Sequence, residues 1–141
     1  MNHPDSSLKV LIVEDEAIVA LELEDRFLAL GWQSVGITPR GEEAIRLAGV
    51  KKPNLVIMDV NLKGEVNGIE AAEAIYRQHS IPSLYITASP LAEVKRRITA
   101  PYFFPVLIKP FDDGIFLKAV TQALHFSPQP GSSSSFSREE D

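Results

Sequence analysis

The sequence predicts an α/β protein in which one parallel β-sheet lies between two layers of helices. Short runs rich in Val, Ile and Leu alternate with longer segments of helical period, which is the pattern of consecutive βα units. The strand segments are apolar almost throughout, as expected for strands that helices cover on both faces. With 141 residues and 45% hydrophobic content, the chain is large enough for one core. We therefore expect a three-layer sandwich in a single domain that spans residues 8–126.

The apolar runs predict five strands, each followed by a helical segment. Apolar residues at helical spacing mark a first helix that Gly31 ends, a second around Ala44–Ala48 and a third around Ile69–Tyr76. The strands are expected at Leu8–Val13, Gln33–Ile37, Leu55–Met58, Ser83–Ile86 and Phe104–Ile108.

The two C-terminal helices are predicted to differ in length. Between Pro90 and Pro101 the apolar stripe is thin, so we expect a short or frayed fourth helix there. The last helix is predicted to begin at Asp112 or Asp113 as its N-cap and to end near His125. From residue 127 onward Pro, Gly and Ser dominate, so residues 127–141, like residues 1–7 at the other end, are predicted to be disordered.

Composition excludes several classes of function. The net charge is -5 and no stretch is dense in Lys or Arg, so direct binding of nucleic acid is not expected. The absence of cysteine excludes disulfides and thiolate metal sites. The apolar runs are too short to span a bilayer, and Met1–Ser7 does not have the character of a secretion signal. We therefore expect a cytoplasmic protein without membrane contact.

Polar side chains follow four of the predicted strands at the points where those strands end. The acidic run Glu14–Glu16 follows the first strand, Asp59 the third and Thr87 the fourth, while Lys109 lies at the end of the fifth. In an open parallel sheet, functional groups gather beyond the carboxyl ends of the strands. These carboxylates, the hydroxyl and the ammonium are therefore expected to converge.

Each of these residues also has an ordinary structural explanation. The acidic residues and Thr87 could cap helices, Asp59 could accept a structural hydrogen bond, and Lys109 could be a surface lysine. Together these explanations fail, because converging carboxylates repel one another and raise each other's pKa unless a cation is present. Mg²⁺ is the natural occupant of such an oxygen site. A carboxylate beside it could attack a phosphoryl group whose charge the metal and Lys109 neutralise, with Thr87 hydrogen bonded to a remaining oxygen.

In these residues the chain resembles the response-regulator receiver family of two-component signalling. The resemblance spans about residues 8–126 and implies a flavodoxin-like, doubly wound (βα)5 fold with strand order 2-1-3-4-5. The motifs that carry it, in the family's order and spacing, are Glu14-Asp15, Asp59, Thr87-Ala88 and Lys109-Pro110.

The resemblance implies a role for each site residue. Asp59 would be the phosphoacceptor, and Asp15 and Asp59 would bind Mg²⁺ together with the backbone carbonyl of Asn61. Glu14 would act mostly through a water molecule that the metal coordinates. Thr87 and Lys109 would contact the phosphoryl group, and the peptide bond that follows this lysine would be cis.

The resemblance also implies partners. The phosphoryl group would come from a phosphohistidine of a sensor histidine kinase or a histidine phosphotransfer protein, and it would alter a partner-binding face around residues 89–110. The chain would be a regulator that assists its own phosphotransfer and dephosphorylation rather than an enzyme. The face of the fourth helix, fifth strand and last helix could also form a homodimer. Residues 61–72 with Ile81-Pro82 are similar to a subgroup of receivers in bacterial stress-response and sensor-kinase pathways.

One position departs from the family pattern. Many receivers carry Tyr or Phe three residues before the lysine, where this chain has Val106. The chemistry of the phosphoacceptor does not depend on that ring, but the usual relay between threonine and an aromatic side chain does. We therefore expect the response to phosphorylation to pass through the segment Ser89–Phe104, which has few apolar residues and is bracketed by prolines.

Three other functions share parts of this pattern. An aspartyl-phosphate phosphatase would typically carry a second aspartate two residues after the nucleophile, where this chain has Asn61. A flavodoxin-like cofactor protein needs a first loop that welcomes phosphate, and Glu14–Glu16 would repel it. A receiver-like interaction module that has lost phosphorylation is disfavoured by the intact site but stays open. Three scattered histidines are predicted to be solvated: His3, His79 and His125.

Overall fold

The computed structural model describes residues 7–128, and within them five parallel strands form one sheet in the order β2-β1-β3-β4-β5. This confirms the predicted flavodoxin-like α/β fold. The strands are β1 (Lys9–Val13), β2 (Gln33–Thr38), β3 (Leu55–Asp59), β4 (Ser83–Thr87) and β5 (Val106–Ile108). The helices are α1 (Ala17–Ala29), α2 (Gly41–Lys51), α3 (Gly68–His79), α4 (Leu91–Arg97) and α5 (Asp113–Leu124).

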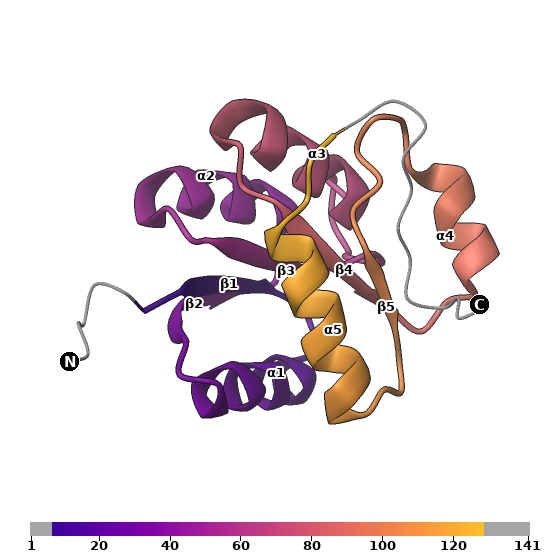
Figure 1. Ribbon diagram of the computed structural model, residues 1–141. Helices are drawn as coiled ribbons and strands as arrows, with labels where there is room; N and C mark the ends of the chain where they lie inside the picture. The colour runs from indigo at the N-terminus through magenta and orange to yellow at the C-terminus, as the bar shows by residue number, and fades with distance from the viewer. Residues whose placement is uncertain (1–6, 129–141) are drawn as a thin grey trace.

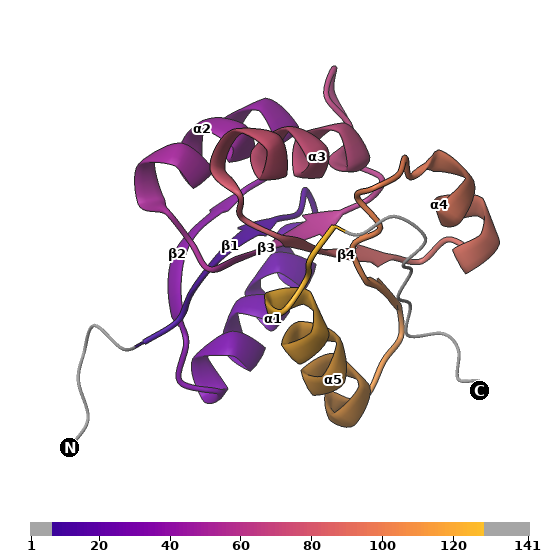
Figure 2. The ribbon, with the colours of Figure 1, turned by 45° about the horizontal axis from the view of Figure 1, so that its top comes forward.

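Helices cover both faces of the sheet and give it two separate cores. Figures 1 and 2 show α1 and α5 on one face and α2, α3 and α4 on the other. On the first face, Phe27 of α1 meets Trp32 and Phe116 edge-on, with ring centroids 5.0 and 5.1 Å apart. On the second face, residues such as Ile75 and Tyr85 are fully buried. Every residue of the central strand β3 is buried, which places the end of that strand deep in the molecule.

The strand order reverses beside β1, and this fixes where a site can form. The chain moves outward from β1 to β2, then crosses back to β3, β4 and β5 on the other side. The helices that follow β1 and β3 therefore lie on opposite faces of the sheet (Figure 2). A cavity lies at the carboxyl ends of these strands. The predicted site residues lie at this edge.

Helix ends agree with the local sequence signals. Gly31, with a φ of 89°, follows the end of α1 as predicted. Asp112 is the N-cap of α5, and its carboxylate accepts a hydrogen bond from the Ile115 N–H at 2.8 Å. α3 begins with a reciprocal capping box, in which Asn67 and Glu70 each accept the other's backbone N–H. α4 is the short helix expected between the two prolines.

Some predicted bounds are wrong. β5 begins at Val106 rather than Phe104; Pro105 has no N–H and pairs with β4 only through its carbonyl, which accepts from the Tyr85 N–H. β1 to β4 each differ by one residue at one end, so that Asp59 and Thr87 are the last residues of their strands.

The prediction that His79 is solvated is wrong in part. The residue is half-buried, because its imidazole lies against Gly49 of α2.

Two further predictions concern the ends of the chain and membranes. The disorder predicted for residues 1–7 and 127–141 falls almost entirely outside the described residues. No helix within residues 7–128 is long and apolar enough to cross a bilayer.

Candidate phosphoryl-transfer site

The predicted site residues meet at the carboxyl edge of the sheet. Glu14 and Asp15 follow β1, Asp59 ends β3, Thr87 ends β4 and Lys109 follows β5. Parallel ladders place these strand ends side by side, and the Lys109 N–H continues the last ladder by donating to the Thr87 carbonyl at 2.8 Å. The convergence expected from the topology is therefore present.

Three carboxylates form the centre of the site. One oxygen each of Glu14, Asp15 and Asp59 lies within 4.8 Å of the other two. The side chains of Glu14 and Asp59 are buried, with 2% and 7% exposure, and Asp15 is half-buried. Buried oxygens of Glu14 (Oε1) and Asp15 (Oδ2) have no hydrogen-bond donor among the described residues. Lys109 Nζ lies 3.8 Å from Glu14 Oε1, which is too far for a hydrogen bond.

These orphaned oxygens make the cluster a good set of ligands for a hard cation. Buried carboxylate oxygens without a donor are costly, because they have lost water and gained nothing in return. A divalent cation such as Mg²⁺ prefers carboxylate and carbonyl oxygens and would satisfy them. The acidic triad therefore fits a receiver magnesium site.

Burial and mutual repulsion shift the pKa of two of these groups. Burial raises the pKa of Glu14 from 4.5 to about 7, and the charge of Asp59 adds to the rise; the Glu16 N–H and the Lys109 ammonium act in the opposite direction. Burial also raises the pKa of Asp59, while hydrogen bonds and Lys109 oppose the rise. Without a metal, Glu14 therefore keeps its proton until the pH approaches neutrality.

The predicted acidic run Glu14–Glu16 divides between two roles. Glu16 is exposed and occupies the N-cap position of α1 without a side-chain capping bond. Its backbone N–H donates to Glu14 Oε2 at 3.1 Å, which fixes the buried carboxylate. Glu16 thus lines the site, but its carboxylate is not part of the acidic triad.

Asp59 is held by its own loop and by the start of α3. Its Oδ1 accepts the Asn61 N–H at 3.0 Å. Gly68, the first residue of α3, lies against the Asp59 backbone so closely that any Cβ there would collide with the Asp59 carbonyl oxygen. Sequence reasoning missed this role of Gly68; the available signal was a glycine directly after the Asn67 cap.

Thr87 is connected to two residues that were not predicted to take part through their side chains. The Ser89 N–H donates to Thr87 Oγ1 at 2.9 Å. The Asn61 amide nitrogen donates to Ser89 Oγ at 3.3 Å and lies 3.5 Å from Thr87 Oγ1. The hydroxyl of Thr87, which is 1% exposed, is thus the point where the β3–α3 and β4–α4 loops meet.

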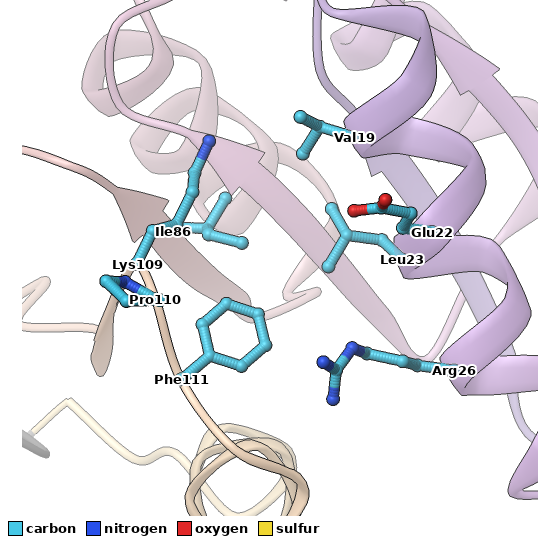
Figure 3. A pocket seen from close by; sticks show the side chains of 8 residues that line it. All are labelled: Val19, Glu22, Leu23, Arg26, Ile86, Lys109, Pro110 and Phe111. Atoms are coloured by element: carbon cyan, nitrogen blue, oxygen red, sulfur yellow. The ribbon is translucent and has the colours of Figure 1, made fainter.

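Lys109 lines two cavities. The first, about 230 Å³, is the site itself, and its lining includes the acidic residues, Asn61, Lys63, Ala88 and Lys109. The second, about 240 Å³, is an apolar groove between α1 and the turn that follows β5 (Figure 3). Leu23 and Ile86 form its wall, and Arg26 closes one end with its guanidinium 4.9 Å from the centre of the Phe111 ring. The bond from Lys109 to Pro110 is cis, as the resemblance implied.

Comparison with known proteins decides the family. Residues 10–121 match the pattern of the response regulator receiver domain. The chain belongs to this family. Receivers are phosphoacceptor signalling modules rather than enzymes, so the acidic pocket of Glu14, Asp15 and Asp59 is consistent with a phosphoacceptor site.

Individual relatives agree with this assignment. The receiver is 34% identical over 116 residues to the transcriptional regulatory protein PdtaR of Mycobacterium tuberculosis, covering 82% of this chain and 56% of PdtaR. It is 29% identical over 123 residues to the phyllosphere-induced regulator PhyR of Methylorubrum extorquens, covering 86% and 45% of the two chains. The solution structure of the receiver domain of Erythrobacter litoralis PhyR superposes with a TM-score of 0.73 at 32% identity, covering 89% and 96%. The chain thus spans about half the length of the curated relatives it matches.

Proposed function

We propose that this receiver is a phosphorylation-dependent switch in which Asp59 accepts a phosphoryl group from a phosphohistidine. The donor would be a sensor histidine kinase or a histidine phosphotransfer protein. The observation that carries this proposal is the placement of Asp59, which ends a fully buried strand inside a cavity that two further carboxylates and Lys109 also line. Because the Asn61 N–H holds Oδ1, the carboxylate is fixed and its other oxygen is available for transfer.

The proposed transfer is an in-line displacement at phosphorus. A bond forms between an Asp59 carboxylate oxygen and phosphorus as the bond from phosphorus to the imidazole nitrogen breaks, and the electron pair stays on that nitrogen until it takes up a proton. Lys109 neutralises charge on the transferring group, and the Thr87 hydroxyl donates to one of its oxygens. These two residues lie at the ends of neighbouring strands, and the hydrogen bond from the Lys109 N–H to the Thr87 carbonyl fixes their relative position.

The cation belongs to the same proposal. Asp15, Asp59 and the backbone carbonyl of Asn61 would hold Mg²⁺, and Glu14 would act mostly through a coordinated water. When bound, the ion neutralises negative charge on the phosphoryl group. The support for it is the pair of buried, unsatisfied oxygens of Glu14 and Asp15 described above.

Intact-mass measurement tests the phosphoacceptor directly. With Mg²⁺ and acetyl phosphate or a candidate kinase, the native chain should gain one phosphoryl group and Asp59→Asn none. Asp25→Asn, at an exposed aspartate of α1, is the matched control and should label like the native chain. Full labelling of Asp59→Asn would sink the assignment. Failure of the native chain to label with any donor would favour the alternative of a phosphorylation-independent interaction module.

We propose the face around residues 89–110 as the output of the switch. It contains α4 and β5, and it begins at Ser89, whose N–H is bonded to the Thr87 hydroxyl. A change at Thr87 can therefore reach this face through a hydrogen bond. A homodimer through α4, β5 and α5 would use the same surface, and sedimentation of the beryllofluoride-bound form against the free form tests it.

A further inference from the structure

Tyr85 is a buried tyrosine that the proposed chemistry does not use. It lies on β4 two residues before Thr87, so both side chains point to the same face of the sheet. The side chain is fully buried, and its ring meets Phe104 edge-on at 5.8 Å. Its hydroxyl has no hydrogen-bond partner among residues 7–128. Buried tyrosine hydroxyls usually find a partner, so this arrangement carries a cost in free energy.

A carboxylate near Tyr85 is already occupied. Glu73 lies one turn before Tyr76 on α3, and the rings of Tyr76 and Tyr85 both pack against Phe104, with centroids 5.7 and 5.8 Å away. Burial raises the pKa of Tyr85 well above its usual value, and the negative charge of Glu73 raises it further, while the positive charge of Arg97 lowers it. The Glu73 carboxylate accepts hydrogen bonds from the Thr99 hydroxyl at 2.9 and 3.1 Å and from the Thr99 N–H at 3.3 Å. Glu73 therefore ties α3 to the residues that follow α4.

α4 is held mainly at its two ends. Within the helix, Val94 is the one buried residue, and Ile98 is buried at its C-cap. Its start is held by the bond from the Ser89 N–H to Thr87, and its end by the bonds from Thr99 to Glu73. An element with so few buried residues has low local stability, so we expect the loss of an end bond to shift it.

We propose that Tyr85 relays the state of the phosphoryl site to α4 by exchanging partners with Thr99 at Glu73. This inference rests on the proposed function and specifies how the site is regulated. In the arrangement described here, Thr99 occupies Glu73 and the Tyr85 hydroxyl is unsatisfied. When a phosphoryl group draws the Thr87 hydroxyl, the Ser89 N–H is released, the start of α4 loosens and Thr99 leaves Glu73. The Tyr85 hydroxyl then donates to the freed carboxylate.

The two arrangements form a two-state element with opposite hydrogen-bond deficits. In one state the buried Tyr85 hydroxyl bonds to Glu73, and in the other the exposed Thr99 does. A modest change in free energy at Thr87 can therefore select between the two states. The location of Tyr85 also bears on the absence of an aromatic residue at position 106. Val106 is the ladder partner of Tyr85, so an aromatic ring is present next to it, on the neighbouring strand β4.

Two variants with opposite expected signs test the exchange. Beryllofluoride with Mg²⁺ mimics the acyl phosphate, and its affinity reports the balance between the two states. Tyr85→Phe removes only the hydroxyl and should weaken beryllofluoride binding by about tenfold, because the loaded state loses one buried hydrogen bond. Thr99→Val removes the competing hydroxyl, keeping only the weaker bond from the backbone N–H, and should tighten binding. Tyr76→Phe, at another ring of the same cluster, should leave it unchanged.

Hydrogen exchange supplies the second readout. In the native chain, beryllofluoride should reduce the protection of residues 91–99, and in Tyr85→Phe this reduction should be largely lost. If Tyr85→Phe and Thr99→Val both bind beryllofluoride like the native chain, the exchange at Glu73 is refuted while the phosphoacceptor site stands. If the native chain binds no beryllofluoride with Mg²⁺, both the proposed function and this inference fail.

Discussion

Replacing Glu14 by Gln should stabilise the metal-free protein, and the gain should grow with pH. The carboxyl of Glu14 is buried, and its pKa is raised from 4.5 to about 7 in the folded state. The folded protein therefore keeps a proton that the unfolded chain releases as pH rises from 4.5 toward 7. Consequently the free energy of unfolding of the native chain falls through this window and is flat above it.

The size of the effect follows from the shift. A rise in pKa from 4.5 to about 7 corresponds to roughly 3 kcal/mol of stability lost above pH 7. Gln has nearly the same shape and cannot ionise, so Glu14→Gln escapes this loss. At pH 8 the variant should be more stable by about 2–3 kcal/mol, or about 10 °C in Tm for a domain of this size. Near pH 4.5 the difference should vanish.

Urea denaturation in a chelator, repeated between pH 4.5 and 8, measures this difference. Glu16→Gln is the matched control, because Glu16 is adjacent but exposed, and its stability profile should follow that of the native chain. Saturating Mg²⁺ should close the gap at high pH, since the ion stabilises the native acidic site. A gap that is independent of pH, or absent, would refute the account of Glu14.

Two further variants separate metal binding from backbone placement. Asp15→Asn removes a proposed ligand and should weaken Mg²⁺ binding, measured by calorimetry, at least roughly tenfold. The control Asp25→Asn should not change the affinity. An unchanged Mg²⁺ titration of Asp15→Asn would count against the site. Gly68→Ala should cost about 2 kcal/mol or more in denaturation, because its Cβ would collide with the Asp59 carbonyl. Gly114→Ala meets only an ordinary contact in α5 and should stabilise by up to about 1 kcal/mol, so equal effects at the two glycines would contradict this explanation.

The fold was predictable because its strands are apolar enough to be recognised one by one. Leu55–Asp59 is buried at every position, and such a run favours a central parallel strand over any alternative. The start of β5 was not predictable from apolar content, since Phe104 and Pro105 continue the hydrophobic run but do not complete the ladder. Hydrogen-bonding capacity, and not hydrophobicity, sets that boundary.

The centre of the site was predictable for a different reason. Parallel strands bring their carboxyl ends to one edge, so residues that follow separate strands must meet whatever the details of packing. Residues on loops have no such constraint. The contacts of Ser89 with Thr87 and Asn61 depend on the path of two loops. The lack of room for a side chain at Gly68 depends on how closely α3 approaches β3. Periodicity carries no information on either distance.

Some buried polar atoms of the described residues have no hydrogen-bond partner, and their positions distinguish functional groups from groups that only pack in the core. Two of them, on Glu14 and Asp15, belong to carboxylates that face one cavity beside Lys109, and an uncompensated carboxylate is far more costly than a hydroxyl. A chain selected only for stability would not keep this cluster, because neutral residues of similar shape would remove the repulsion. A bound cation changes this balance, because the carboxylates that repel one another without it become its ligands. Binding of the cation then stabilises the folded protein. The hydroxyl of Tyr85 is buried in the core, and the exchange proposed above gives it a partner from within the chain, the Glu73 carboxylate, whose present hydrogen bonds come from an exposed residue.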